Sequence, residues 1–136
     1  MASSLLKLSD VTANDSNKTF TVPAGYTYEI LYGQVDYTST ATVGNRQILL
    51  EILDTDSNVI WDVHAGTVQA ASLNRHYSIL QGVFRETAFV DGDIQLTIPR
   101  KGKILPGYTI KVYDSAEVDA TADDMNVHLV VEKVKI

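Results

Sequence analysis

The residues best suited to acid–base chemistry in this chain are its three histidines, His64, His76 and His128. A hydrolase would need one of them beside a nucleophile and an orienting carboxylate. No serine stands in the G-x-S-x-G pattern of a nucleophile elbow. His128 alternates outward in a strand-like segment, while His64 and His76 flank a polar loop. We therefore expect exposed or edge histidines, no catalytic residues and no enzymatic activity.

Paired carboxylates of the kind that glycosidases use occur twice, as Asp54 with Asp56 and as Asp91 with Asp93. Both pairs lie in turn-forming segments, where aspartate is favoured because its side chain bonds the local backbone. We interpret them as turn residues.

Segment 54–58, DTDSN, resembles the first half of a calcium-binding loop, D-x-D-x-N. Val59 stands where such a loop needs glycine, and no glutamate occupies the bidentate position. Residues 119–124, DATADD, add further carboxylates beside Glu117. Solvated acidic turns are the favoured interpretation, so we predict no metal site and no cofactor. A divalent cation bound by these loops is the alternative.

The composition excludes several classes of protein. The chain has 136 residues, no cysteine and a net charge of −6, so it has no disulfide and is expected to repel nucleic-acid phosphates. No window approaches the roughly 18 apolar residues of a membrane span, and we expect no membrane association. The lack of cysteine fits folding in a cytoplasm, and the first 17 residues are too polar for a signal peptide.

Alternating apolar and polar residues predict strands almost throughout. We expect an all-β, antiparallel β-sandwich of about eight strands, with little or no helix, as a single domain over 18–136. Gly33 is predicted to mark a bulge or a bend, because the apolar alternation shifts after it. The expected strands are 18–22, 26–38, 46–54, 58–64, 76–81, 94–98, 108–113 and 125–135, with long loops at 65–76 and 115–124.

One corner device appears twice, in TVPAGYTYEI (21–30) and ILPGYTIKVY (104–113). Proline fixes φ and lacks an N–H, glycine adopts the turn conformation, and Tyr-Thr starts a strand. Alternation places Tyr108 toward the core and leaves Tyr26 open. The same reasoning places Trp61 in the core.

Candidate interface residues lie at the chain ends and among the arginines. Segment 1–17 is either an arm whose Leu5, Leu6 and Leu8 add a strand to a neighbour's sheet, or a first strand in its own sheet. Ile136 ends the chain and is a further candidate. We favour Arg46 and Arg75 as inter-subunit contacts, because arginine forms bidentate bonds across interfaces; surface salt bridges are the alternative.

Four motifs between residues 20 and 132 resemble the small β-sandwich virion proteins of tailed bacteriophages. These are VPAG before a long strand, T-A-T-x-G-N-R-Q before the next, D-x-x-S-N-V-I-W as a hairpin, and L-P-G-Y-x-I-x-V-Y-D late in the chain. The second motif contains Asn45, Arg46 and Gln47, to which the resemblance attaches no function.

The resemblance implies a jelly roll and a non-enzymatic capsid decoration or cement protein. Such a protein binds the outer capsid surface, clamps neighbouring major capsid subunits and acts as a dimer or trimer. It would reside on the capsid exterior after folding in the host cytoplasm. A phage tail, neck or fibre protein is the first alternative, and a carbohydrate-binding module is the second.

Overall fold

The computed structural model describes residues 3–82 and 93–136. Within these ranges every regular element is a β-strand, which confirms the all-β prediction, and a membrane-spanning helix is accordingly not found there. All eight expected strands form, and β1 and the short β8 are added to them. The strands are β1 (Ser3–Asp10), β2 (Asn17–Thr21), β3 (Tyr26–Thr38), β4 (Ile48–Leu53), β5 (Val59–His64), β6 (Asn74–Gln81), β7 (Asp93–Ile98), β8 (Lys103–Ile104), β9 (Thr109–Asp114) and β10 (Asp124–Lys135).

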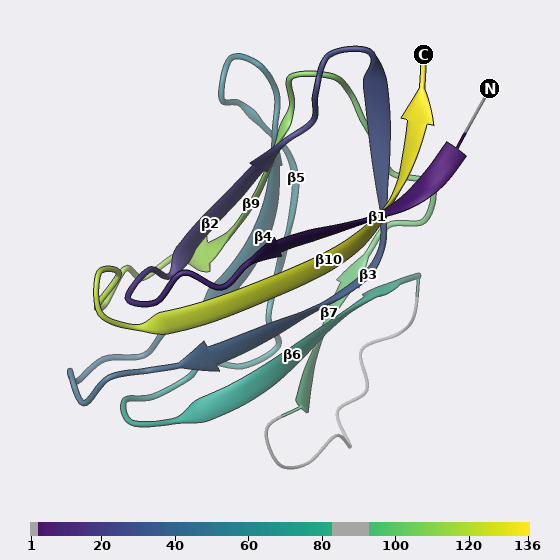
Figure 1. Cartoon of the computed structure of the whole chain (residues 1–136). Coiled ribbons are helices and arrows are strands. Elements are labelled where there is room, and N and C mark those ends of the chain that lie inside the picture. The colour runs from purple at the N-terminus through teal and green to yellow at the C-terminus, as the bar shows by residue number, and fades with distance from the viewer. Residues whose placement is uncertain (1–2, 83–92) are drawn as a thin grey trace.

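The strands form two sheets that pack face to face as a sandwich (Figure 1). Sheet A has the order β1-β10-β3-β6-β7, with β8 also paired to β3, and sheet B has the order β2-β9-β4-β5. Four of the antiparallel pairs are nested in the sequence: β1 with β10, β2 with β9, β3 with β6, and β4 with β5. This nested order is that of a jelly roll, in which the chain doubles back about the β4–β5 hairpin.

The core lies between the sheets and is built from alternate residues of each strand. β4 departs from simple alternation, because Leu49 is also buried on the outer face of sheet B. Trp61 is half-buried and packs against the core, as expected. The buried core side chains are Val22, Tyr28, Ile30, Val35, Tyr37, Ile48, Leu50, Ile52, Ala65, Tyr77, Ile79, Leu96, Ile98, Ile104, Ile110, Val112, Met125, Val127, Leu129 and Val131.

A bulge in β3 accounts for the shift in its alternation, but it lies two residues before the predicted position. Ile30 pairs with Val131 and Tyr32 pairs with Val130, so Leu31 is the extra residue. Gly33 has another role, because a Cβ there would lie 2.7 Å from the His128 carbonyl oxygen and 2.6 Å from the Leu129 side chain. Glycine is therefore needed at 33 for close approach of β3 to β10.

The two Pro-Gly corners have the same turn geometry. In each, the tyrosine N–H donates to the carbonyl oxygen three residues earlier, at 3.3 Å for Tyr26 and 3.1 Å for Tyr108. Gly25 and Gly107, at the third position of each turn, have φ of 83° and 81°. A type II turn requires this positive φ, which explains the repeated glycine.

The two corners also bond to each other. The Val22 N–H donates to the Tyr108 carbonyl at 3.0 Å, and the Gly107 N–H donates to the Val22 carbonyl at 2.8 Å. Tyr108 packs against the core, which confirms its predicted direction. Tyr26 is half-buried under the Lys133 ammonium, which lies 4.2 Å from its ring centre.

Candidate interaction surface at the loop end

Four loops gather at one end of the sandwich, which we call the loop end. They are residues 11–16, 39–47, 65–73 and 115–123, and they connect β1 to β2, β3 to β4, β5 to β6 and β9 to β10. The nested pairing brings them together, since the end of β3 lies beside the start of β10 (Figure 1). Loops at one end of a rigid sandwich are a common place for binding.

A buried ion pair joins two of these loops. Arg46 and Asp123 have no exposed side-chain surface, and they form a two-point bond, from Nε to Oδ2 at 2.9 Å and from Nη2 to Oδ1 at 3.1 Å. Asp123 also accepts the Tyr37 hydroxyl at 2.5 Å and the Thr40 N–H at 2.8 Å. The carboxylate is thus satisfied by donors from three residues, one at the end of β3 and two in the loop that follows it.

The rest of the Arg46 guanidinium organises its own loop. Nη1 donates to the carbonyls of Thr42 at 2.9 Å and Gly44 at 2.8 Å, and Nη2 donates to Thr40 Oγ1 at 3.3 Å. Loop 39–47 therefore folds around the guanidinium of its own Arg46. A different loop conformation would leave buried carbonyl groups without a hydrogen-bond donor, which is unfavourable.

The ionisation of this group follows from its contacts. Burial alone would raise the pKa of Asp123, but the hydrogen bonds from Arg46, Thr40 and Tyr37 outweigh burial and lower that pKa. Burial and the adjacent carboxylate both raise the pKa of Tyr37, so its hydroxyl keeps its proton and remains a donor. The pair is charged and fully bonded, which makes it a positioning device for the loops.

Gln69 ties the third loop to the same centre. Its backbone N–H and carbonyl bond to those of Arg46, both at 2.8 Å. Its side-chain amide donates to the carbonyls of Tyr37 and Leu73 at 3.0 Å each, and accepts the Tyr77 hydroxyl at 2.7 Å. Burial raises the pKa of Tyr77 to about 12, which keeps this donor protonated.

The acidic segment 115–123 also holds the loops of this end together. Asp119 Oδ2 accepts the hydroxyls of Thr40 at 2.6 Å and Thr42 at 2.9 Å. The interpretation of residues 119–124 as a solvated acidic turn is wrong for Asp123, which is buried, and for Asp119, which is half-buried. Among the residues that the structure describes, no group of three or more His, Cys, Asp or Glu side chains is arranged to hold a metal ion.

The surface that results carries exposed apolar side chains on a fixed backbone. Val43 is 92% exposed at the tip of its loop, and Val68 and Leu73 are 42% and 37% exposed in the neighbouring loop. Exposed apolar side chains held by a preorganised frame favour contact with another protein.

The structure distributes the six candidate interface residues over different regions. Arg46 lies in the interior, with its donors bonded inside the chain. Arg75 is half-buried behind the loop end and donates to the Val68 carbonyl at 3.3 Å. Leu5, Leu6 and Leu8 belong to β1. Ile136 is 65% exposed at the other end of the sandwich, where its N–H bonds to the Gly25 carbonyl.

Two of the histidines lie on the outer face of sheet A. The Ser9 hydroxyl lies 2.7 Å from His128 Nδ1, across the β1–β10 pair, and His76 pairs with Asp36 across β3–β6. His64 ends the edge strand β5. These contacts cross the open face of a sheet and converge on no common centre.

The two carboxylate pairs noted in the sequence lie in different kinds of structure. Asp54 Oδ1 accepts the N–H groups of Asp56 and Asn58, both at 2.9 Å, and the bond from Asn58 is the main cause of its lowered pKa. This confirms the predicted turn role of Asp54. Asp91 lies outside the described residues, and Asp93 begins β7.

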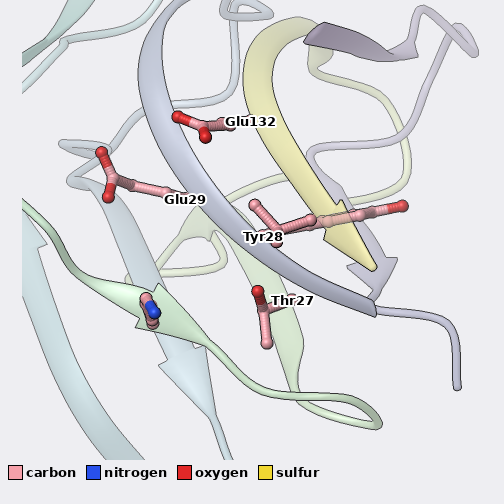
Figure 2. Close-up of a pocket in the computed structure, with 6 residues that line it drawn as sticks. Thr27, Tyr28, Glu29 and Glu132 are labelled. Carbon is pink, nitrogen blue, oxygen red and sulfur yellow. The ribbon is translucent and has the colours of Figure 1, made fainter. Parts of the chain in front are cut away.

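A small hollow of about 60 Å³ lies on the outer face of sheet A (Figure 2). Glu29 and Glu132 stand directly opposite each other there, and Glu29 accepts the Gln81 amide at 2.9 Å. Its volume is far below the roughly 300 Å³ of small ligand sites. Thr27, Tyr28, Glu29, Lys103, Glu132 and Val134 line it.

Sequence reasoning missed Asp123, Tyr37 and Gln69 as parts of one site. A signal was present for the ion pair: Arg46 shares its alternation with Ile48, and Asp123 shares its alternation with Met125. Opposite charges at inward positions indicate a buried pair, because an inward charge needs a partner.

No protein-family model matches this chain, and no curated protein matches it either.

Proposed function

We propose that this chain is a non-enzymatic virion structural protein, a capsid decoration or cement protein that binds the outer capsid surface and clamps neighbouring major capsid subunits. The observation that carries the proposal is the loop end, where the Arg46–Asp123 pair holds an apolar-tipped surface in place. The resemblance to small phage virion sandwiches supports it, as does the jelly-roll strand order, which occurs in viral capsid domains.

Two of the four motifs behind the resemblance supply contacts that hold the loop end. Arg46 of T-A-T-x-G-N-R-Q bonds Asp123, and the N–H of Gln47 donates to Asp114 of L-P-G-Y-x-I-x-V-Y-D at 2.9 Å. These two motifs thus help to build the loop end of this sandwich.

The proposed mechanism is stabilisation by linkage. A shell under internal pressure fails where neighbouring subunits separate, and a protein bound across that seam adds its binding free energy to the closed state. Preorganised loops strengthen this effect because they lose little conformational entropy on binding. The protein then acts on the capsid exterior without catalysis, nucleic acid or membrane.

The test adds the purified chain to expanded capsids that lack it and follows DNA release on heating. Decorated capsids should release DNA at a higher temperature than bare capsids. Val43→Asp should weaken capsid binding at least tenfold, because burial of a valine side chain contributes about 1.5 kcal/mol or more. Val59→Asp, at a 50% exposed site on β5, is the matched control and should bind normally.

Equal melting of decorated and bare capsids would exclude the cement role. Copy number separates a tail, neck or fibre position, because decoration requires many copies per particle and a tail part requires few. Densitometry of purified virions measures it.

A further inference from the structure

β1 is an open edge of sheet A. It pairs with β10 over its full length, and its second side bonds no strand within the described chain. Its eight residues are extended without a bulge. The edges of sheet B are protected differently: β5 carries a bulge at Ile60, and β2 has five residues. Bulges and short strands are the means by which proteins block edge pairing, and β1 uses neither.

The side chains of β1 suit a covered position better than an open one. Leu5 is 68% exposed on the outer face of the sheet. Leu6 and Leu8 face the core but are half-buried, and no further strand of the described residues lies beside them. A long edge strand with three leucines promotes association unless another strand covers it.

We propose that a second copy of this chain covers this edge, with β1 of each copy pairing antiparallel about a two-fold axis at Leu6. Two-fold pairing is isologous, which means that the same strand of each copy forms the contact. The unpaired backbone N–H and carbonyl groups of one β1 edge then bond those of the other. Side chains alternate between the two faces of a strand, so odd-numbered residues of β1 lie on the outer face and even-numbered residues lie on the core face. The two copies match face to face only if odd residues pair with odd residues, so the two paired numbers must have an even sum. A centre at Lys7 would set two ammonium groups directly opposite each other, which is unfavourable. A centre at Leu6 pairs Leu6 with itself, sets Leu5 opposite Lys7 and includes residues 3–9.

Charge complementarity favours the same arrangement. Two copies that each carry a charge of −6 repel each other, but β1 is locally neutral because it holds Lys7 and Asp10. On the outer face, Leu5 lies beside Glu132, which stands opposite Glu29. In the proposed register Lys7 of the second copy lies about two strand spacings, roughly 10 Å, from Glu132, the nearer of the two carboxylates.

The test measures the mass of the full chain by sedimentation equilibrium over a range of concentrations. A dimer is expected. Leu5→Lys sets two like-charged pairs across the axis and should raise the dimer dissociation constant roughly tenfold. Leu5→Lys combined with Lys7→Glu turns these into opposite-charge pairs and should restore the dimer. Val59→Lys, at an exposed site on β5, is the matched control and should leave it unchanged.

Hydrogen exchange gives a second readout that does not depend on the variants. Backbone amides of Ser3–Ser9 should exchange more slowly at high protein concentration than at low concentration. A monomer at all concentrations, a trimer, or a dimer insensitive to Leu5→Lys would each overturn the proposal. These results are independent of capsid binding, which can fail while the dimer stands.

Discussion

Arg46 and Asp123 show how much one residue pair can organise. Seventy-seven positions separate them, yet their bond fixes loop 39–47 against the start of β10. A buried ion pair adds little net stability compared with an apolar pair, but the loss of one partner leaves an uncompensated buried charge. The change in unfolding free energy caused by a substitution here therefore depends on whether the other charged partner is left buried without its counter-ion.

Arg46→Ala should lower the free energy of unfolding by about 3–5 kcal/mol, because Asp123 and the carbonyls of Thr42 and Gly44 lose their donor. Urea denaturation followed by circular dichroism measures the change. Arg75→Ala is the matched control: its contact is a single long bond at the surface, and a loss within about 0.5 kcal/mol is expected. Similar losses in both variants would contradict the role given to the buried pair.

At the scale of elements, the repeated Pro-Gly corner is one turn used on two neighbouring strands. β2 and β9 pair antiparallel, so the turn after β2 and the turn before β9 meet at the same end of sheet B. The sequence predicts both turns, since proline and glycine favour a turn locally and Tyr-Thr favours the strand that follows. It does not show that the turns bond each other, because that contact depends on which strands pair.

Gly25→Ala should destabilise the fold by about 1–2 kcal/mol through the backbone alone. Gly25 has a φ of 83°, which is unfavourable for a residue with a Cβ, although no atom lies within 4 Å of the added carbon. Gly102→Ala is the control, because its nearest contact would be an ordinary 3.6 Å and its φ is not in the left-handed region. Chemical denaturation of the two variants compares them, and an unchanged midpoint for Gly25→Ala would refute the turn argument.

The bulge in β3 shows what alternation can and cannot locate. Val35 and Tyr37 share a face that differs from the expected continuation of Tyr28 and Ile30, so the existence of a shift is readable from the sequence. Its position is not, because Leu31 and Gly33 both fit the pattern. Pairing with Val130 and Val131 decides it.

At the scale of the whole molecule, the nested pairing makes both sheets depend on one core. β1 and β10 come from opposite ends of the chain, and Ser3 pairs with Val134. The two sheets are complete only when all four nested strand pairs have formed. Long-range pairing of this kind is slow to form but cooperative.

The chain should therefore unfold in a single transition. Fluorescence of the single tryptophan, Trp61, reports on sheet B, and far-ultraviolet circular dichroism reports on both sheets. The two signals should give the same midpoint and the same slope in urea. Two separated transitions would show instead that the sheets unfold independently.

The sequence by itself determined the all-β class, the positions of eight strands and the two corners. These properties depend on backbone sterics, turn chemistry and side-chain alternation, which act over a few residues. Only the tertiary structure decided that β1 joins its own sheet, that Leu31 is the bulge, and that Arg46 meets Asp123. Such choices depend on pairings between distant segments, where many registers satisfy the local pattern and burial of the whole core selects one.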